Sequence, residues 1–183
     1  MPTLSPATVD DIPAISALID ASVRGLSDGY YDGKQVAASL RHLFGVDTQL
    51  IRDATYFVIE DEGAVVGSGG WSARRTLYGG DQFKAAADPL LDPATDAARI
   101  RAFFVHPAFA RRGLGRMLFN RCASAAFAAG FRRLELVATR PGEPLYRALG
   151  FTALEPVVAR LPDGVEIPCT LMTRQLDAAD GQR

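Results

Sequence analysis

The segment ARRGLGRML, residues 110–118, constrains the fold most, because it places two glycines and three arginines between a predicted strand and a predicted helix. The run before it, ARIRAFFVHP, is apolar and rich in β-formers and ends at Pro107, whereas the residues after it have helical apolar spacing. Unpaired N–H groups at a helix N-terminus carry about half a positive charge, and glycine lets an anion approach them. The segment predicts a phosphate or pyrophosphate site; the simpler interpretation is a turn with solvated arginines.

Two common phosphate-binding motifs do not fit this segment. A P-loop requires G-x-x-x-x-G-K-[ST], but the two residues directly after Gly115 are Arg116 and Met117, neither a lysine nor a hydroxyl residue. A dinucleotide-binding G-x-G-x-x-G would need a third glycine where the chain has Leu118, and it would stand near the start of a repeated βαβ pattern. The spacing therefore favours another kind of phosphate site.

Composition limits the function classes. A chain of 183 residues with 48% hydrophobic and 22% charged residues is typical of one globular domain. Its net charge of -1 argues against a nucleic-acid partner, which usually requires a basic face. Cys122 and Cys169 have no metal-ligand spacing, so we expect no metal. The sequence shows no signal peptide and no apolar run long enough for a bilayer, so we expect a cytoplasmic protein without a membrane partner.

Periodicity predicts an alternation of helices and strands. The N-terminal third favours two amphipathic helices, and a hairpin over 55–71 follows with its turn at 61–63. An irregular loop over about 72–96 is long enough to form a substrate wall. We then expect a strand over 98–105, a helix over about 113–129, a strand over 133–138, a short helix within 142–151 and a terminal hairpin.

We expect the domain to span residues 1–176 and residues 177–183 to form a frayed tail. The long terminal hairpin offers an exposed edge through which a homodimer could form.

The segment RAFFVHPAFARRGLGRML, followed by LELVAT and LYRALGF, resembles the GNAT superfamily of N-acetyltransferases. Its coenzyme A loop has the pattern Q/R-x-x-G-x-G/A, which Gly113 and Gly115 match, whereas Ala110 departs from the first position. The resemblance implies an α/β fold with a mixed, mainly antiparallel sheet, flanked by helices, whose parallel central strands splay apart. It also implies an acetyl-CoA-dependent N-acetyltransferase that acts on a primary amine of a small molecule or peptide.

The resemblance assigns coenzyme A contacts to the backbone of the strand before the loop, to the loop itself and to the end of the next strand. These residues are Phe103, Phe104, Val105, Arg111, Arg112, Gly113, Leu114, Gly115, Arg116 and Thr139. Phe103 and Phe104 are also candidates for the core, because a side chain can pack while its backbone binds a ligand.

Tyr146 matches the tyrosine that in this family donates a proton to the departing sulfur. A phenol with a pKa near 10 keeps its proton at neutral pH, so it can serve as a general acid. The base is less defined: Glu60 could relay a proton through water, and His106, Glu135 or a bound water are alternatives. Glu60 also fits a solvated turn.

For the amine acceptor, the resemblance points to the N-terminal helices and to the loop after the hairpin. Candidate lining residues are Tyr30, Tyr31, Trp71, Arg74, Arg75, Tyr78 and Phe83. The arginines would suit a carboxylate or phosphate on the acceptor, or they are ordinary surface. A non-catalytic acyl-CoA-binding or sensing module on the same fold is the alternative function.

Overall fold

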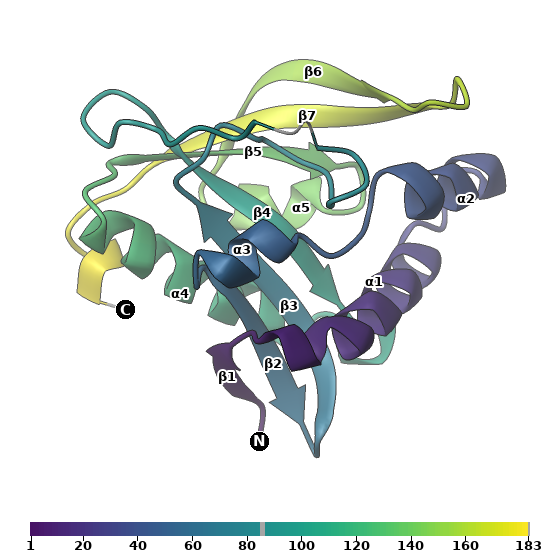
Figure 1. Ribbon diagram of the computed structural model, residues 1–183, viewed down its shortest axis with the longest axis horizontal. Coiled ribbons are helices and arrows are strands. Elements are labelled where there is room, and N and C mark those ends of the chain that lie inside the picture. The colour runs from purple at the N-terminus through teal and green to yellow at the C-terminus, as the bar shows by residue number, and fades with distance from the viewer. Residues whose placement is uncertain (85–86, 183) are drawn as a thin grey trace.

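The strands of the computed structural model, which describes residues 1–84 and 87–182, form one mixed sheet (Figure 1). The strand order is β1-β2-β3-β4-β5-β7-β6, and all neighbours are antiparallel except β4 and β5. The strands are β1 (Thr3–Pro6), β2 (Tyr56–Asp61), β3 (Ala64–Ser72), β4 (Ala98–Val105), β5 (Arg133–Thr139), β6 (Thr152–Arg160) and β7 (Glu166–Gln175). This architecture confirms the predicted fold class.

Helices cover both faces of the sheet. They are α1 (Ile12–Leu26), α2 (Gly33–His42), α3 (Thr48–Arg52), α4 (Leu114–Ala128) and α5 (Glu143–Ala148), with short 3-10 turns η1 (Val9–Asp11), η2 (Pro107–Phe109) and η3 (Asp180–Gln182). In Figure 1, α1 and α3 lie in front of the sheet and α4 lies behind it. The core divides in the same way, because residues of α4 and α1 enter different apolar clusters on the two faces.

The sequence predicted most of these elements. The hairpin β2–β3 has a two-residue turn at Glu62 and Gly63, both with positive φ, which matches the twist of the flanking strands. The long helix buries Leu118 and Cys122 completely, as its apolar spacing predicts. We did not predict β1 or α3, which are too short to display a period.

The expectation of a frayed C-terminal tail is not met in the described residues. The tail folds back along α4, and Asp180 is fully buried. Its carboxylate accepts a hydrogen bond from Arg174 Nη2 at 3.0 Å and another from the Asp177 amide at 3.1 Å. A buried, ion-paired aspartate therefore anchors a segment whose polar composition resembles a free end.

Strand β6 forms an edge of the sheet and exposes Leu154 and Val158. The Leu161 amide donates to the Val165 carbonyl, so by alternation the main-chain groups of Pro156 face the open edge. Proline has no N–H, which removes one donor from the edge expected to pair with a second copy.

No helix in the described part of the chain is long and apolar enough to cross a bilayer. Among these residues, no three or more His, Cys, Asp or Glu side chains gather in a way that could hold a metal ion.

Candidate functional site

Strands β4 and β5 separate in the middle of the sheet. They pair in parallel at Ala98–Leu134 and Arg99–Glu135, and within the described residues their pairing extends no further. Two residues of β4, Ala102 and Phe103, oppose the single residue Gly69 of β3, and Ala102 has φ of 55°. This bulge bends β4 and accompanies its divergence from β5. The central strands therefore leave backbone groups without a neighbouring strand.

The register between β3 and β4 decides which backbone groups of β4 point toward β3 and which point to the other side, where β5 diverges. The His106 amide donates to the Val66 carbonyl at 2.9 Å, so two residues earlier Phe104 forms the next hydrogen-bonded pair with Ser68. The main-chain groups of Phe103 and Val105 consequently point away from β3. The backbone of Phe104 was predicted to bind a cofactor, but in the structure its main-chain groups face Ser68 of β3.

The N-terminus of α4 presents free main-chain N–H groups. Gly113 is the N-cap with φ of 85°, and Arg111 before it also has a positive φ, 64°. In the described structure, no protein atom accepts a hydrogen bond from the amides of residues 113–116. Arg111, Arg112 and Arg116 are exposed around these four donors. The sequence prediction of a phosphate-sized site thus has the geometry that it requires.

Tyr146 on α5 lies against the divergent strand. Its ring packs near Phe103, with centroids 6.2 Å apart, and edge-on against Phe151 at 5.8 Å. Burial raises the pKa of the Tyr146 phenol, so it is protonated at neutral pH. Among the described residues no group hydrogen-bonds to its hydroxyl, which leaves the proton available to a bound molecule.

Two contacts hold α5 and Tyr146 in place. The Gly142 amide donates to the Thr139 carbonyl at 3.0 Å, which forms the turn from β5 into α5. On the opposite side, a Cβ at Gly115 would lie 2.7 Å from Leu145 Cδ2, so glycine permits α4 to approach α5 this closely. Thr139 and Gly115, which were both predicted as cofactor residues, therefore also help to fix the position of Tyr146, the predicted general acid.

The predicted bases lie elsewhere or are already paired. Glu60 and His106 line a groove with Ala14 and Ala17 of α1, on the face of the sheet opposite the α4 cluster that Tyr146 joins. Glu135 accepts a hydrogen bond from Arg99 Nη1 at 2.6 Å. The structure brings none of these three side chains together with Tyr146.

The predicted acceptor residues have different environments. Trp71 is a core residue, packed edge-on against Phe131, because both faces of β3 are covered. Arg74 forms two hydrogen bonds with Asp53, at 2.6 and 3.0 Å, and thereby fixes the loop after β3. Those bonds hold the pKa of the Asp53 carboxyl below its usual value. Trp71 and Arg74 thus both have contacts within the protein, and their role toward an acceptor stays a prediction.

The three tyrosines predicted to line the acceptor site also differ in their surroundings. The buried Tyr31 hydroxyl donates to the Pro168 carbonyl at 2.6 Å and accepts from the Arg140 amide at 3.0 Å, so it ties the α1–α2 connection to β7 and β5. Tyr78 is half-buried beside Phe83, with ring centroids 5.5 Å apart. Tyr30 is exposed.

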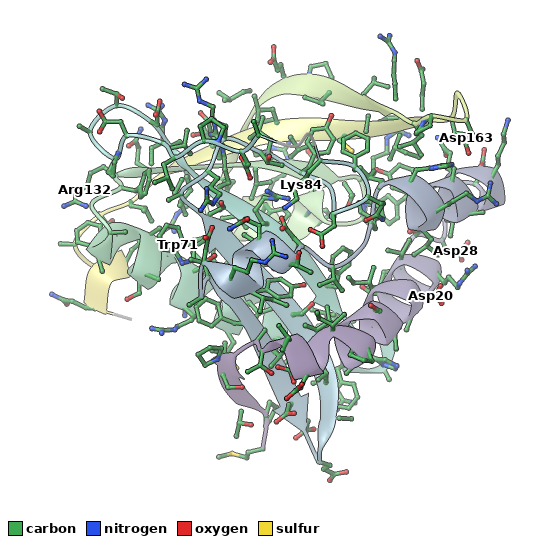
Figure 2. The ribbon with its side chains drawn as sticks, in the orientation of Figure 1. Asp20, Asp28, Trp71, Lys84, Arg132 and Asp163 are labelled. Atoms are coloured by element: carbon green, nitrogen blue, oxygen red, sulfur yellow. The ribbon has the colours of Figure 1, made fainter. Side chains whose placement is uncertain are left out.

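A buried ion cluster, which sequence reasoning missed, holds the loop over the sheet. The Asp47 carboxylate bonds to Arg101 Nη2 at 2.8 Å and to Lys84 Nζ, and Figure 2 labels Lys84 in that loop. Arg101 also donates to the carbonyls of Thr76 and Gly79. These residues are far apart in the sequence, and only an unusual arginine within an apolar strand hinted at the cluster.

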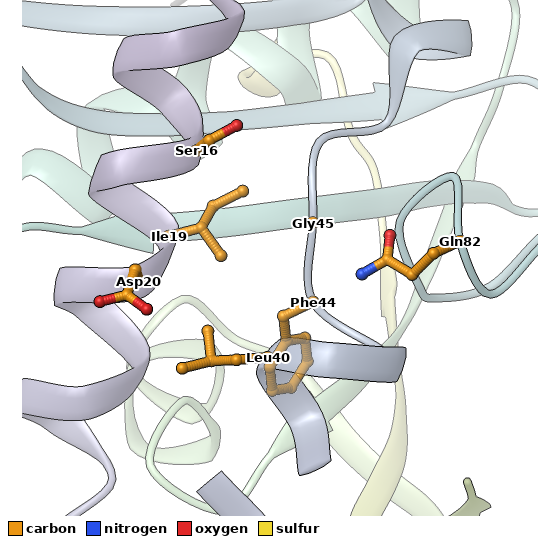
Figure 3. A pocket seen from close by; sticks show the side chains of 7 residues that line it. All are labelled: Ser16, Ile19, Asp20, Leu40, Phe44, Gly45 and Gln82. Carbon is orange, nitrogen blue, oxygen red and sulfur yellow. The ribbon is translucent and has the colours of Figure 1, made fainter. Parts of the chain in front are cut away.

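A pocket opens between α1 and the segment after α2 (Figure 3). Ser16 and Asp20 project from α1 toward it, and Gln82 reaches it from the loop. Phe44 lines it and packs edge-on against Phe104 of β4, with centroids 5.9 Å apart. Phe44 therefore lies between this pocket and Phe104 of β4, the strand that diverges from β5.

Comparison with known proteins gives one family and many similar folds. The family described as Acetyltransferase (GNAT) family matches residues 25–151. The GCN5-related N-acetyltransferase of Rhodopseudomonas palustris is 20% identical with a TM-score of 0.71, covering 96% of each chain. The phosphinothricin acetyltransferase of Sinorhizobium meliloti, solved with acetyl-CoA, is 22% identical with a TM-score of 0.62, covering 96% of this chain and 88% of its own.

PaiA N-acetyltransferase of Thermoplasma acidophilum, solved with coenzyme A, is 10% identical with a TM-score of 0.62, covering 96% of this chain and 99% of its own. At these identities the structures demonstrate a shared fold. A search of curated protein sequences gave no match.

Proposed function

The chain belongs to the GNAT acetyltransferase family, and on that basis we propose that it is an acetyl-CoA-dependent N-acetyltransferase that acts on a primary amine of a small molecule or peptide. The observation that carries the proposal is the convergence of three features. The free amides of residues 113–116, the part of the β4 backbone that lacks a neighbouring strand and the Tyr146 phenol lie around the point where β4 and β5 diverge. We assign the activity to a domain over residues 1–176.

In this proposal the amides at the start of α4 bind the coenzyme A pyrophosphate. The helix dipole and the four N–H donors favour an anion at this place. The exposed side chains of Arg111, Arg112 and Arg116 add charge-assisted contacts. Ala110 replaces the family's polar first position, but the main-chain donors do not depend on that side chain.

The pantetheine arm would lie beside β4 as an additional strand. Phe103 and Val105 offer their main-chain groups on that side, whereas Phe104 uses its own for β3. We propose that the Phe103 amide polarises the thioester carbonyl, because a fixed donor at that oxygen stabilises the charge that develops during attack. Thr139 contributes by forming the turn that positions Tyr146.

In the reaction a neutral amine attacks the thioester carbon, the new C–N bond forms and the C–S bond breaks. Tyr146 gives its phenolic proton to the departing thiolate, since a buried phenol keeps that proton until a strong acceptor appears. The amine must lose a proton, and we assign this step to bound water, because Glu60 and Glu135 are displaced or paired.

The acceptor would approach from the face that carries α1 and α2. The pocket of Figure 3 supports this direction, because its Phe44 wall touches Phe104. Tyr78 and Tyr30 lie on the loop and the α1–α2 connection that border the same face. We place the acceptor's selectivity in these elements.

The experiment is a panel of amines and peptides incubated with acetyl-CoA, with free thiol release as the readout. We expect thiol release that depends on one class of amine, and calorimetric binding of acetyl-CoA without acceptor. Binding without turnover of any amine would favour a sensing module instead. Absence of binding would refute the cofactor assignment.

A further inference from the structure

The side chain of Ser22, on α1, accepts a hydrogen bond from a main-chain N–H of β4 beside the proposed cofactor site. The Val105 amide donates a hydrogen bond to Ser22 Oγ at 3.3 Å, and Ser22 is only 5% exposed. The distance lies just beyond the usual range for N–H···O bonds, so the bond is weak. It joins a helix to the part of β4 that lacks a neighbouring strand.

The direction of this amide is fixed by the sheet. His106 and Phe104, the residues on either side, pair with β3, so the Val105 N–H points to the side from which β5 diverges. A molecule that lay beside β4 as an additional strand would place its own oxygen along this N–H. Ser22 Oγ already lies there.

The contact also has a rigid support. Gly25 is one helical turn after Ser22, and a Cβ at Gly25 would lie 2.3 Å from Pro107 Cγ. Glycine thus allows α1 to press against η2, two residues after Val105. Because residues three apart share one face of a helix, this close approach also holds Ser22 over Val105.

We infer that Ser22 Oγ occupies, in the free protein, the hydrogen-bonding position that the pantetheine arm takes in the loaded protein. This inference rests on the proposed function. An amide N–H has a single hydrogen, so the serine hydroxyl and the cofactor carbonyl compete for Val105. Ser22 is a positioning residue that stabilises the empty site, lowers cofactor affinity and returns to the amide as coenzyme A leaves.

The test is Ser22→Ala, with Ser16→Ala as the matched control. Both changes replace a serine of α1 and raise helix propensity equally, but Ser16 is exposed, lines the pocket of Figure 3, and its side chain forms no hydrogen bond within the described residues, so it serves as a control for acetyl-CoA binding. We expect acetyl-CoA to bind Ser22→Ala about fivefold more tightly than it binds the wild type or Ser16→Ala, which corresponds to about 1 kcal/mol. Calorimetry measures these affinities.

A second probe separates competition from a general effect on the fold. Adenosine 3′-phosphate 5′-diphosphate carries the phosphates of coenzyme A without the pantetheine arm, so Ser22→Ala should leave its affinity unchanged. In addition, relative to Ser16→Ala, Ser22→Ala should lower the melting temperature of the free protein but not of the acetyl-CoA complex, because only the free form loses a partner for Val105.

Equal or weaker acetyl-CoA binding by Ser22→Ala would overturn the inference, as would an equal gain for adenosine 3′-phosphate 5′-diphosphate. If the wild-type protein binds no acetyl-CoA, the proposed function fails instead. If wild type binds it and the variant shows no gain, the proposed function stands and the role of Ser22 does not.

Discussion

Gly69→Ala should lower the catalytic rate far more than it lowers stability, because Gly69 leaves room for the Phe103 ring, which packs near Tyr146. An added Cβ would lie 2.4 Å from Cδ1, 2.8 Å from Cε1 and 3.1 Å from Cγ of Phe103, whereas ordinary contact begins at 3.4 Å. The ring must retreat by about 1 Å, the difference between 3.4 and 2.4 Å. On its other side stands Tyr146, itself packed against Phe151.

Overpacking of this kind costs about 1–3 kcal/mol of stability. A displacement of about 1 Å at reacting groups can cost roughly 100-fold in rate. We therefore expect Gly69→Ala to remain folded with a slightly lower melting temperature and to lose about 10- to 100-fold in kcat/KM, measured by thiol release with the best amine of the panel.

Gly67→Ala is the matched control, two residues earlier on the same strand and the same face. Its Cβ would meet Ile59 at 3.4 Å, an ordinary contact, so it should retain nearly full activity. Adding Phe103→Leu to Gly69→Ala removes part of the clash and should recover some of the rate. If Gly69→Ala turned over as fast as Gly67→Ala, the link between the bulge and the general acid would be refuted.

Three further outcomes follow from other contacts. Tyr146→Phe should lower kcat more than tenfold while the calorimetric Kd for acetyl-CoA changes less than about twofold, and equal turnover would remove this phenol from the mechanism. Asp47→Ala leaves the buried Arg101 guanidinium unpaired, so we expect a loss of about 3 kcal/mol in denaturant unfolding; a loss below about 1 kcal/mol would contradict that role. Arg74 lowers the pKa of Asp53, so this pair stabilises the fold above the unfolded pKa near 3.9, and the stability is lost as pH falls through the lower folded pKa. The stability advantage of wild type over Asp53→Asn should accordingly shrink between pH 6 and pH 3, and a constant difference would show that the charge does not matter.

Local chemistry could be predicted from the sequence. The strand before Pro107, the glycine loop and the helix after it are specified by neighbouring residues, so their order and bounds agree with the structure. The same holds for the β2–β3 turn, whose glycine is adjacent to the residues that it connects. The loop could also be proposed as an anion site, because the first N–H groups of a helix have no partner within the helix.

The rest depends on residues far apart in the chain. No pattern distinguishes Trp71 as core or Arg74 as an ion-pair partner, because the covering helix and Asp53 come from other elements. The bulge at Ala102 is equally hidden, since an alanine gives no sign of its positive φ.

The sequence by itself therefore determined most of the elements and the place of the proposed anion site, since adjacent residues fix backbone conformation locally. Only the tertiary structure decided which donors of β4 are free and that Ser22 covers one of them. The reason is that a backbone amide's partner depends on strand register and helix docking, which are set by packing across the whole sheet.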